Sequence, residues 1–305
     1  MPAYEGLCDK IVGQVLTCQN MSIKDIKARI LSNIKIGPGY YKMYLEAPYI
    51  ARLAKPGQFL QIRCNDSLEP FLRRPFSIHR IKGQESRAKG IEILYEVVGK
   101  GTEVLVKKKE GEFLDILGPL GNGFSLPRIT TEGSPERSRV TNHERRTTNS
   151  KSTAIIIAGG IGAAPLVFLA EELAEKRIKT IVLLGAKTKH NILCERDFRK
   201  LGAEVHVATD DGTFGHKGFV TRLFQNIVKT LNLKLQTKVY ACGPEPMLKN
   251  IGRLCVNQGI ECQVSVEEYM ACGIGACLGC VVKTKKGDRL VCRDGPVFNS
   301  SELLW

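Results

Sequence analysis

Short alternating runs of apolar residues dominate residues 9–124. They are rich in β-branched and aromatic side chains, and turn residues such as Gly37-Pro38-Gly39 and Lys55-Pro56-Gly57 separate them. Alternation with a period of two is typical of strands that bury one face. The pattern predicts strands at 26–36, 40–46, 58–63, 76–80, 91–98 and 112–117. Six strands without long intervening helices predict an antiparallel barrel over residues 1–127.

The pattern changes twice along the rest of the chain. Residues 128–152 are mostly Ser, Thr, Arg, Glu and Asn, which predicts a flexible polar insertion or linker. After it, apolar strands alternate with helices, as in a Rossmann-like parallel sheet at 153–264. The expected strands are 154–158, 180–184, 203–208 and 238–242, and the expected helices are 164–176 and 246–256. Residues 265–305 depart from this rhythm and predict a small C-terminal domain.

Composition narrows the class of protein without deciding its function. The chain is 43% hydrophobic and 25% charged, as globular proteins are, with a formal net charge of +14. That charge suits a polyanion, phosphorylated cofactors or a solvated basic face equally. The uncharged stretch 152–170 carries glycines and Pro165 in its middle, which predicts strand, turn and helix rather than a membrane span. Since no N-terminal secretory signal is evident, we expect a cytoplasmic protein without a transmembrane segment.

The strongest chemical signal is a group of cysteines near the C-terminus. Its members are Cys272, Cys277, Cys280 and Cys292. A C-x4-C-x2-C run with a distant fourth cysteine is the plant-type spacing for a [2Fe–2S] cluster. The glycines between the first two cysteines let backbone N–H groups turn toward sulfur. A structural zinc site is the alternative, although zinc favours paired short spacings and only Cys277 and Cys280 have one.

Two segments of the predicted barrel could hold a phosphorylated flavin. Arg73-Arg74-Pro75-Phe76-Ser77 begins a strand, where an arginine fork could bind pyrophosphate and a serine the ring edge. Gly99-Lys100-Gly101-Thr102 follows a strand and opens a short helix, whose free N–H groups bind phosphate. Each segment alone is a weak signal.

Three turns of the predicted parallel sheet could hold a dinucleotide. Gly159, Gly160 and Gly162 lie between an apolar strand and a helix, at the first turn of such a sheet. Cys242-Gly243-Pro244 ends a later strand at the same edge. Asp210 ends a third strand and could accept ribose hydroxyls. Plain strand-to-helix turns and a capping carboxylate are the alternatives.

The order of these motifs resembles the electron-transfer subunits of dihydroorotate dehydrogenase B, within the ferredoxin–NADP reductase-like flavoproteins. Segments 266–272 and 291–298 carry the resemblance most closely, whereas the insertion at 128–152 and the short gap before Cys292 depart from it. The resemblance implies cluster ligation by the four cysteines, and NAD(H) as the cofactor that the three turns of the sheet could hold. It implies FAD contacts from Arg74, Pro75, Phe76, Ser77, Leu94, Tyr95, Glu96, Gly101 and Thr102.

The implied path of electrons joins NAD(H), FAD, the [2Fe–2S] cluster and a partner chain, because a flavin exchanges both electron pairs and single electrons. In the family the partner is an FMN subunit that oxidises dihydroorotate to orotate in pyrimidine (UMP) biosynthesis. A heterotetramer with two of each chain is implied, without nucleic acid. The close alternative is a small flavoprotein subunit of a ferredoxin:NADP+ oxidoreductase, sulfide dehydrogenase or hydrogenase. A zinc module that binds a polyanion is the alternative from another class.

Overall fold

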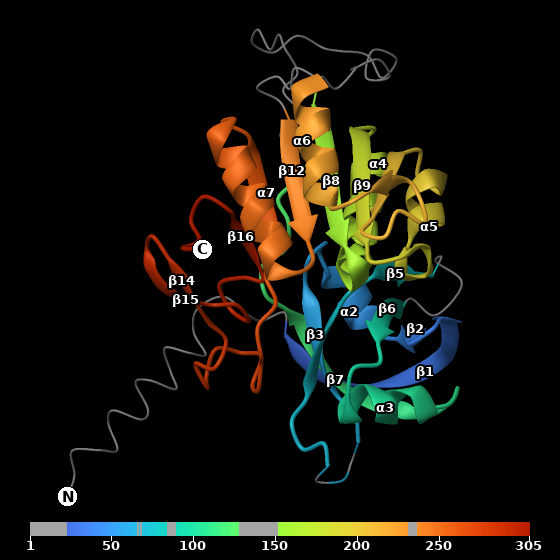
Figure 1. Cartoon of the computed structure of the whole chain (residues 1–305). Helices are drawn as coiled ribbons and strands as arrows, with labels where there is room; N and C mark the ends of the chain where they lie inside the picture. Colours follow the sequence, from blue (N-terminus) through green and yellow to red (C-terminus); the bar gives the residue numbers. More distant parts are fainter. Residues whose placement is uncertain (1–22, 66, 68, 84–89, 128–151, 231–236) are drawn as a thin grey trace, which may run out of the picture.

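A computed structural model describes residues 23–65, 67, 69–83, 90–127, 152–230 and 237–305 (Figure 1). A curled antiparallel sheet is followed by a parallel sheet covered by helices, and a small C-terminal segment lies beside both. Residues 128–151 of the predicted insertion lie outside the described residues. Within the described ranges, no helix is both long and apolar enough to cross a membrane.

The N-terminal sheet confirms the predicted antiparallel barrel, with seven strands instead of six. They are β1 (Lys24–Gly37), β2 (Tyr40–Glu46), β3 (Phe59–Arg63), β4 (Arg74–Ser77), β5 (Arg80–Lys82), β6 (Gly90–Glu96) and β7 (Phe113–Leu120), in the order β4-β3-β7-β1-β2-β6-β5. Helices α2 (Pro48–Leu53) and α3 (Lys100–Lys107) connect them.

The prediction of a single strand at 76–80 was wrong, because the backbone hydrogen bonds pass from one neighbouring strand to another within this range. The Ile78 N–H donates to the Gln58 carbonyl beside β3, whereas the His79 N–H donates to the Glu92 carbonyl in β6. These two consecutive residues therefore bond near opposite ends of the sheet, Ile78 beside β3 and His79 to β6. Since β4 and β5 are the two edge strands, this corner curls the sheet into a half-barrel.

The second sheet confirms the predicted Rossmann-like arrangement. Its strands are β8 (Thr153–Gly159), β9 (Lys179–Ala186), β10 (Glu204–Thr209), β11 (His216–Lys217), β12 (Thr237–Cys242), β13 (Glu261–Ser265) and β16 (Val297–Asn299), in the order β11-β10-β9-β8-β12-β13-β16. All neighbours are parallel except β13 and β16. The helices are η2 (Gly160–Gly162), α4 (Ala163–Glu175), η3 (Lys189–Asn191), α5 (Glu195–Lys200), α6 (Val220–Thr230) and α7 (Glu245–Asn257).

The strand order reverses between β8 and β12, which places a crevice at their carboxyl ends. Central strand β8 reads as an unbroken apolar run because both of its faces are covered, and Ile155, Ile156 and Ile157 are fully buried. Ligands of open α/β sheets bind outside such a reversal. The glycine turns at 159–162 and 243–244 lie there.

Polar contacts join the barrel to the parallel sheet. The Arg80 guanidinium lies 2.6 Å from a Glu171 carboxylate oxygen in α4 and 3.3 Å from Asp197 in α5. The buried His79 Nδ1 lies 2.7 Å from the Ala164 carbonyl oxygen, in the first turn of α4. The corner that closes the barrel therefore also docks it onto the second sheet.

The C-terminal segment packs against both sheets. It contains the hairpin β14 (Val281–Thr284) and β15 (Gly287–Leu290), and then β16, which pairs with β13. Phe59 and Leu120 of the barrel share one buried cluster with Cys280 and Cys292. The predicted cysteine site is thus held next to the barrel wall.

Candidate functional site

A cleft of about 560 Å³ lies where the barrel meets the carboxyl edge of the parallel sheet. Tyr40 and Glu96 line it from the barrel. Of the residues predicted to bind a dinucleotide, Gly159, Gly160, Gly162, Asp210, Gly243 and Pro244 line it from the sheet. Cys242 is the exception, because its side chain is buried beneath the turns.

Glycine is required where two of these turns meet. A Cβ atom on Gly162 would lie 2.4 Å from the Cys242 carbonyl oxygen, and one on Gly159 would lie 2.8 Å from the Met247 sulfur. The turns can touch only without side chains. No side chain caps the start of α4, where the Ala163 N–H donates to the Gly160 carbonyl and Pro165 has no N–H.

Arg74 and the Gly101 turn meet at one end of the barrel. A Cβ on Gly101 would lie 3.1 Å from the Arg74 Cγ, so the arginine chain crosses the first turn of α3. The Thr102 hydroxyl donates to the Gly99 carbonyl at 2.9 Å and accepts from the Val98 and Gly99 N–H groups. This arrangement fixes the turn and places a guanidinium beside a helix N-terminus, as a phosphate site requires.

The two adjacent arginines have different partners. Arg73 donates to the Asp25 carboxylate at 2.8 Å and to the Asp115 carbonyl at 2.9 Å, which ties β1 and β7 to the start of β4. Among the described residues, the hydrogen bonds of the Arg74 guanidinium run to the Leu72 and Arg73 carbonyls. Arg73 thus pairs with a carboxylate, and Arg74 pairs with none among these residues.

The other predicted flavin contacts divide between two faces of the barrel. The Phe76 and Tyr95 rings pack inside it, edge to face with centroids 5.9 Å apart, and the Tyr95 hydroxyl donates to Asn33 Oδ1 at 3.0 Å. Pro75 and Ser77 alternate with Phe76 and so lie on the outer face. Glu96 lines the cleft, and Leu94 packs beside it in the cluster shared with the second sheet.

Two residues that line the cleft, Tyr40 and Glu267, were not predicted as site residues. Tyr40 pairs with Glu96 across β2 and β6, and burial together with Glu96 raises its pKa against the opposing effect of Asn191. Burial likewise raises the pKa of Glu267, which lines the cleft from the segment before the cysteines. Tyr40 belongs to no motif, whereas Glu267 lies in segment 266–272, for which no cleft role was predicted; strand register and the course of the C-terminal segment bring them here.

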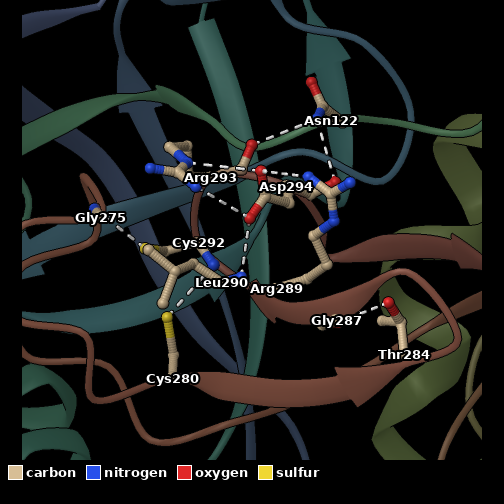
Figure 2. Close-up of polar contacts among 10 residues, drawn as sticks. All are labelled: Asn122, Gly275, Cys280, Thr284, Gly287, Arg289, Leu290, Cys292, Arg293 and Asp294. Carbon is tan, nitrogen blue, oxygen red and sulfur yellow. Dashed lines mark hydrogen bonds and ion pairs between the residues drawn. The ribbon is translucent and has the colours of Figure 1, made fainter. Parts of the chain in front are cut away.

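The four cysteines fall into two pairs within a loop rich in hydrogen-bond donors. The Cys277 N–H donates to the Cys272 sulfur at 3.4 Å, and the Cys292 N–H donates to the Cys280 sulfur at 3.4 Å. The Gly275 N–H links the pairs, because it donates to the Cys292 sulfur at 3.1 Å (Figure 2). No three or more His, Cys, Asp or Glu side chains of the described ranges converge as a single-ion site.

The loop favours negatively charged sulfur at Cys272, whereas burial and the neighbouring Cys280 raise the pKa of the Cys292 thiol to about 12. Burial raises the pKa of the Cys272 thiol, but the N–H groups of Cys277 and Ile274 oppose it and hold the net pKa below its ordinary value. Gly273 and Gly275 have φ values of +72° and +83°, which turn these N–H groups inward. Four cysteine sulfurs in two pairs, with N–H donors beside them, fit a two-iron cluster.

Hydrogen bonds from the barrel hold this loop in place. The Asn122 amide, which follows β7, donates to the carbonyls of Arg293 and Asp294 at 3.2 and 3.1 Å. The Asp294 carboxylate in turn accepts the Leu290 N–H at 2.8 Å and pairs with Arg293 (Figure 2). These contacts fix the segment that carries Cys292.

Comparison with solved structures defines the class of protein. A chain in the structure of the NADH-dependent reduced ferredoxin-NADP oxidoreductase is 27% identical, with a TM-score of 0.73, and the match covers 91% of this chain and 90% of that one. A ferredoxin NADP+ reductase from Neisseria gonorrhoeae with bound FAD and NADP is 18% identical at a TM-score of 0.58, over 79% of this chain and 93% of that one. The class is a ferredoxin–NADP reductase-like oxidoreductase.

Family comparisons are more specific. Residues 267–304 match the iron-sulfur cluster binding domain of dihydroorotate dehydrogenase B, and residues 156–252 match the oxidoreductase NAD-binding domain. The dihydroorotate dehydrogenase B (NAD(+)) electron transfer subunit of Desulforamulus reducens is 40% identical over 92% of this chain and 99% of its own. That of Fusobacterium nucleatum is 38% identical over 93% and 99%.

The chain therefore belongs to the family of dihydroorotate dehydrogenase B electron transfer subunits. The predicted iron–sulfur segment and NAD-binding domain are confirmed by the two family matches, and the zinc alternative is not supported. The ferredoxin:NADP+ oxidoreductase alternative is not favoured either, since identity to its structure is 27% against 40% for the Desulforamulus subunit.

Proposed function

We propose that this chain carries electrons between NAD+ and an FMN subunit that oxidises dihydroorotate to orotate in pyrimidine (UMP) biosynthesis. The observation that carries the proposal is the packing of the cysteine loop on the barrel, where Phe59 and Leu120 share a buried cluster with Cys280 and Cys292. This contact supports a proposed iron–sulfur site beside the proposed flavin site. The work divides among an FAD region at 1–127, an NAD region at 153–264 and a cluster region at 265–305.

The FAD site uses the charged end and the outer face of the barrel. Arg74 and the N–H groups of Gly101 and Thr102 hold the pyrophosphate, because they supply the cation and free donors that it needs. Pro75 and Ser77 line the ring from β4. Strand β6 supplies Leu94, Tyr95 and Glu96 to the same site. The rings of Phe76 and Tyr95 support these strands from inside the barrel.

The NAD site uses the reversal point of the parallel sheet. Gly159, Gly160 and Gly162 let the pyrophosphate approach the start of α4, and Asp210 accepts ribose hydroxyls. Cys242, Gly243 and Pro244 border the nicotinamide end, with Glu96 across the cleft. Hydride transfer between two rings requires this meeting of barrel and sheet.

Cys272, Cys277, Cys280 and Cys292 would hold the [2Fe–2S] cluster, and backbone N–H groups join their sulfurs in two pairs, Cys272 with Cys277 and Cys280 with Cys292. When bound, FAD exchanges electron pairs with a nicotinamide and single electrons with a [2Fe–2S] cluster. The role of this chain is to hold the two cofactors and the nicotinamide within reach of one another.

The partner subunit docks over the cysteine loop in this proposal. Tyr269, Leu278 and Ile274 are 94%, 63% and 45% exposed in this segment, and Cys277 is exposed as well. Exposed apolar side chains clustered on one surface mark protein interfaces. A heterotetramer of two chains of each kind is the assembly that we propose.

We also place the protein in the cytoplasm. All nine cysteines of the described residues are free, as a reducing compartment favours.

Analysis of the anaerobically purified chain tests the cofactor content. We expect two irons, two acid-labile sulfides and one FAD per chain, with NADH-dependent reduction of artificial dyes. Dihydroorotate should leave the isolated chain oxidised, because its oxidation belongs to the partner. Stoichiometric zinc in place of iron, or dihydroorotate oxidation without a partner, would contradict the proposal.

A further inference from the structure

Gln61 is a buried polar residue that the proposed electron path does not account for. It lies in the middle of β3 with no exposed surface, and both its amide nitrogen and its amide oxygen lack a hydrogen-bond partner among the described residues. Leaving a buried carboxamide without hydrogen bonds is unfavourable. A fully buried strand position normally favours an apolar side chain, and the neighbouring Leu60 and Ile62 are both apolar.

Strand geometry directs Gln61 toward the cysteine loop. Leu60 and Ile62 pack in the barrel core, whereas Phe59 packs with the C-terminal segment, so Gln61 lies on the same outer face as Phe59. A Cβ on Gly273 would lie 2.5 Å from the Gln61 Cγ and 3.1 Å from its Nε2. The carboxamide therefore lies directly against the residue that follows Cys272.

The same residue also borders the proposed flavin strand. Gln61 pairs with Pro75 across β3 and β4, and directly paired residues project to the same face. Its side chain is thus between the strand that lines the flavin and the loop that begins the cluster site. Gly273 permits this approach because it has no Cβ atom, for which there would be no room. Its φ of +72° also favours glycine.

We propose that Gln61 is a positioning residue whose carboxamide N–H donates a hydrogen bond to cluster sulfur beside Cys272. A buried donor without a protein acceptor gains one when negatively charged sulfur occupies the loop. Hydrogen bonds to cluster sulfur stabilise the reduced, more negative state and set its reduction potential. Gln61 would therefore adjust the one-electron exchange between the cluster and the flavin. The inference rests on the proposed cluster at the four cysteines.

Redox titration of the cofactor-loaded chain, monitored by electron paramagnetic resonance, tests this role. For Gln61→Leu we expect the equilibrium constant for electron transfer from flavin to cluster to fall about tenfold, or 59 mV for one electron. Gln61→Glu should lower the potential further, because it replaces the donor with a negative charge. An unchanged cluster potential in Gln61→Leu would overturn the proposal.

Gln58 provides the matched control. Its amide donates to the Gly121 carbonyl at 2.7 Å and accepts the Lys55 N–H at 2.8 Å, so its partners are all in the protein. Gln58→Leu should lower the thermal unfolding midpoint and leave the cluster potential in place. An equal potential shift in both variants would show a general effect of packing and would also overturn the proposal.

A measurement on the unmodified chain covers the case in which Gln61 variants fail to fold. Pulsed paramagnetic resonance of the reduced cluster, in protein with ¹⁵N in glutamine side chains, should reveal a ¹⁵N coupling. A cluster signal without that coupling would refute the Gln61 contact alone. Absence of any cluster signal would instead refute the proposed function.

Discussion

The cysteine loop and the dinucleotide cleft are built in opposite ways. The loop takes its four thiols from residues 272–292, and the N–H groups that face them come from the same segment. The cleft takes residues from Tyr40 to Glu267, which meet only because the barrel docks on the parallel sheet. Because its ligands are local, the loop should depend less than the cleft on the docking of the barrel against the parallel sheet.

The largest expected effect is loss of the cluster without loss of the flavin. Cys277→Ser removes one proposed iron ligand at an exposed position, so the fold keeps its packing. We expect iron and the reduced-cluster resonance signal to disappear, while FAD absorbance and flavin reduction by NADH persist. Cys194→Ser, outside the loop, should retain full iron content. Loss of FAD together with iron would break the comparison.

The next effect separates two adjacent arginines. Arg74→Ala should weaken FAD binding by about 10- to 150-fold, since a hydrogen bond to a charged group contributes roughly 1.5–3 kcal/mol. Arg73→Ala removes the contacts to Asp25 and Asp115, so it should lower the unfolding midpoint and change FAD affinity far less. Equilibrium dialysis of flavin measures both. Equal losses of affinity would show that Arg74 is not the pyrophosphate ligand.

The smallest effect concerns pH and the docking of the two sheets. Burial lowers the pKa of His79 to about 4, and the nearby Lys42 and Arg80 charges act in the same direction, against Ala164 and Glu92. The unfolded chain takes up this proton near pH 6.5, so the stability that neutral His79 provides is complete above that pH. It is lost as the pH falls toward 4, by about 2 kcal/mol at pH 5.

Thermal unfolding at pH 7 and pH 5 measures this dependence. His79→Gln should lose less stability between the two values than the unmodified chain does. His190→Gln, at an exposed site, should lose as much as the unmodified chain. The same pH dependence in His79→Gln would show that this contact does not control docking.

The sequence predicts best what depends on neighbouring residues. Central strands such as β8 are continuous apolar runs because both faces are buried, and the cysteine spacing is itself the site. The strand at 76–80 was misjudged because its division at Ile78 and His79 depends on two distant strands. Tyr40 and Gln61 follow no motif; their positions depend on strand register and on the docking of the C-terminal segment.

Anaerobic mixing with the cognate FMN subunit tests the central claim most directly. The measurement is NAD+ reduction by dihydroorotate, with the unmodified chain and with Cys280→Ser. We expect NADH to form only in the mixture that contains the unmodified chain, and both chains to reduce dyes with NADH. NADH formation by the Cys280→Ser mixture would contradict the proposed route through the cluster. No NADH formation in an assembled complex of the unmodified chain would contradict the proposed function itself.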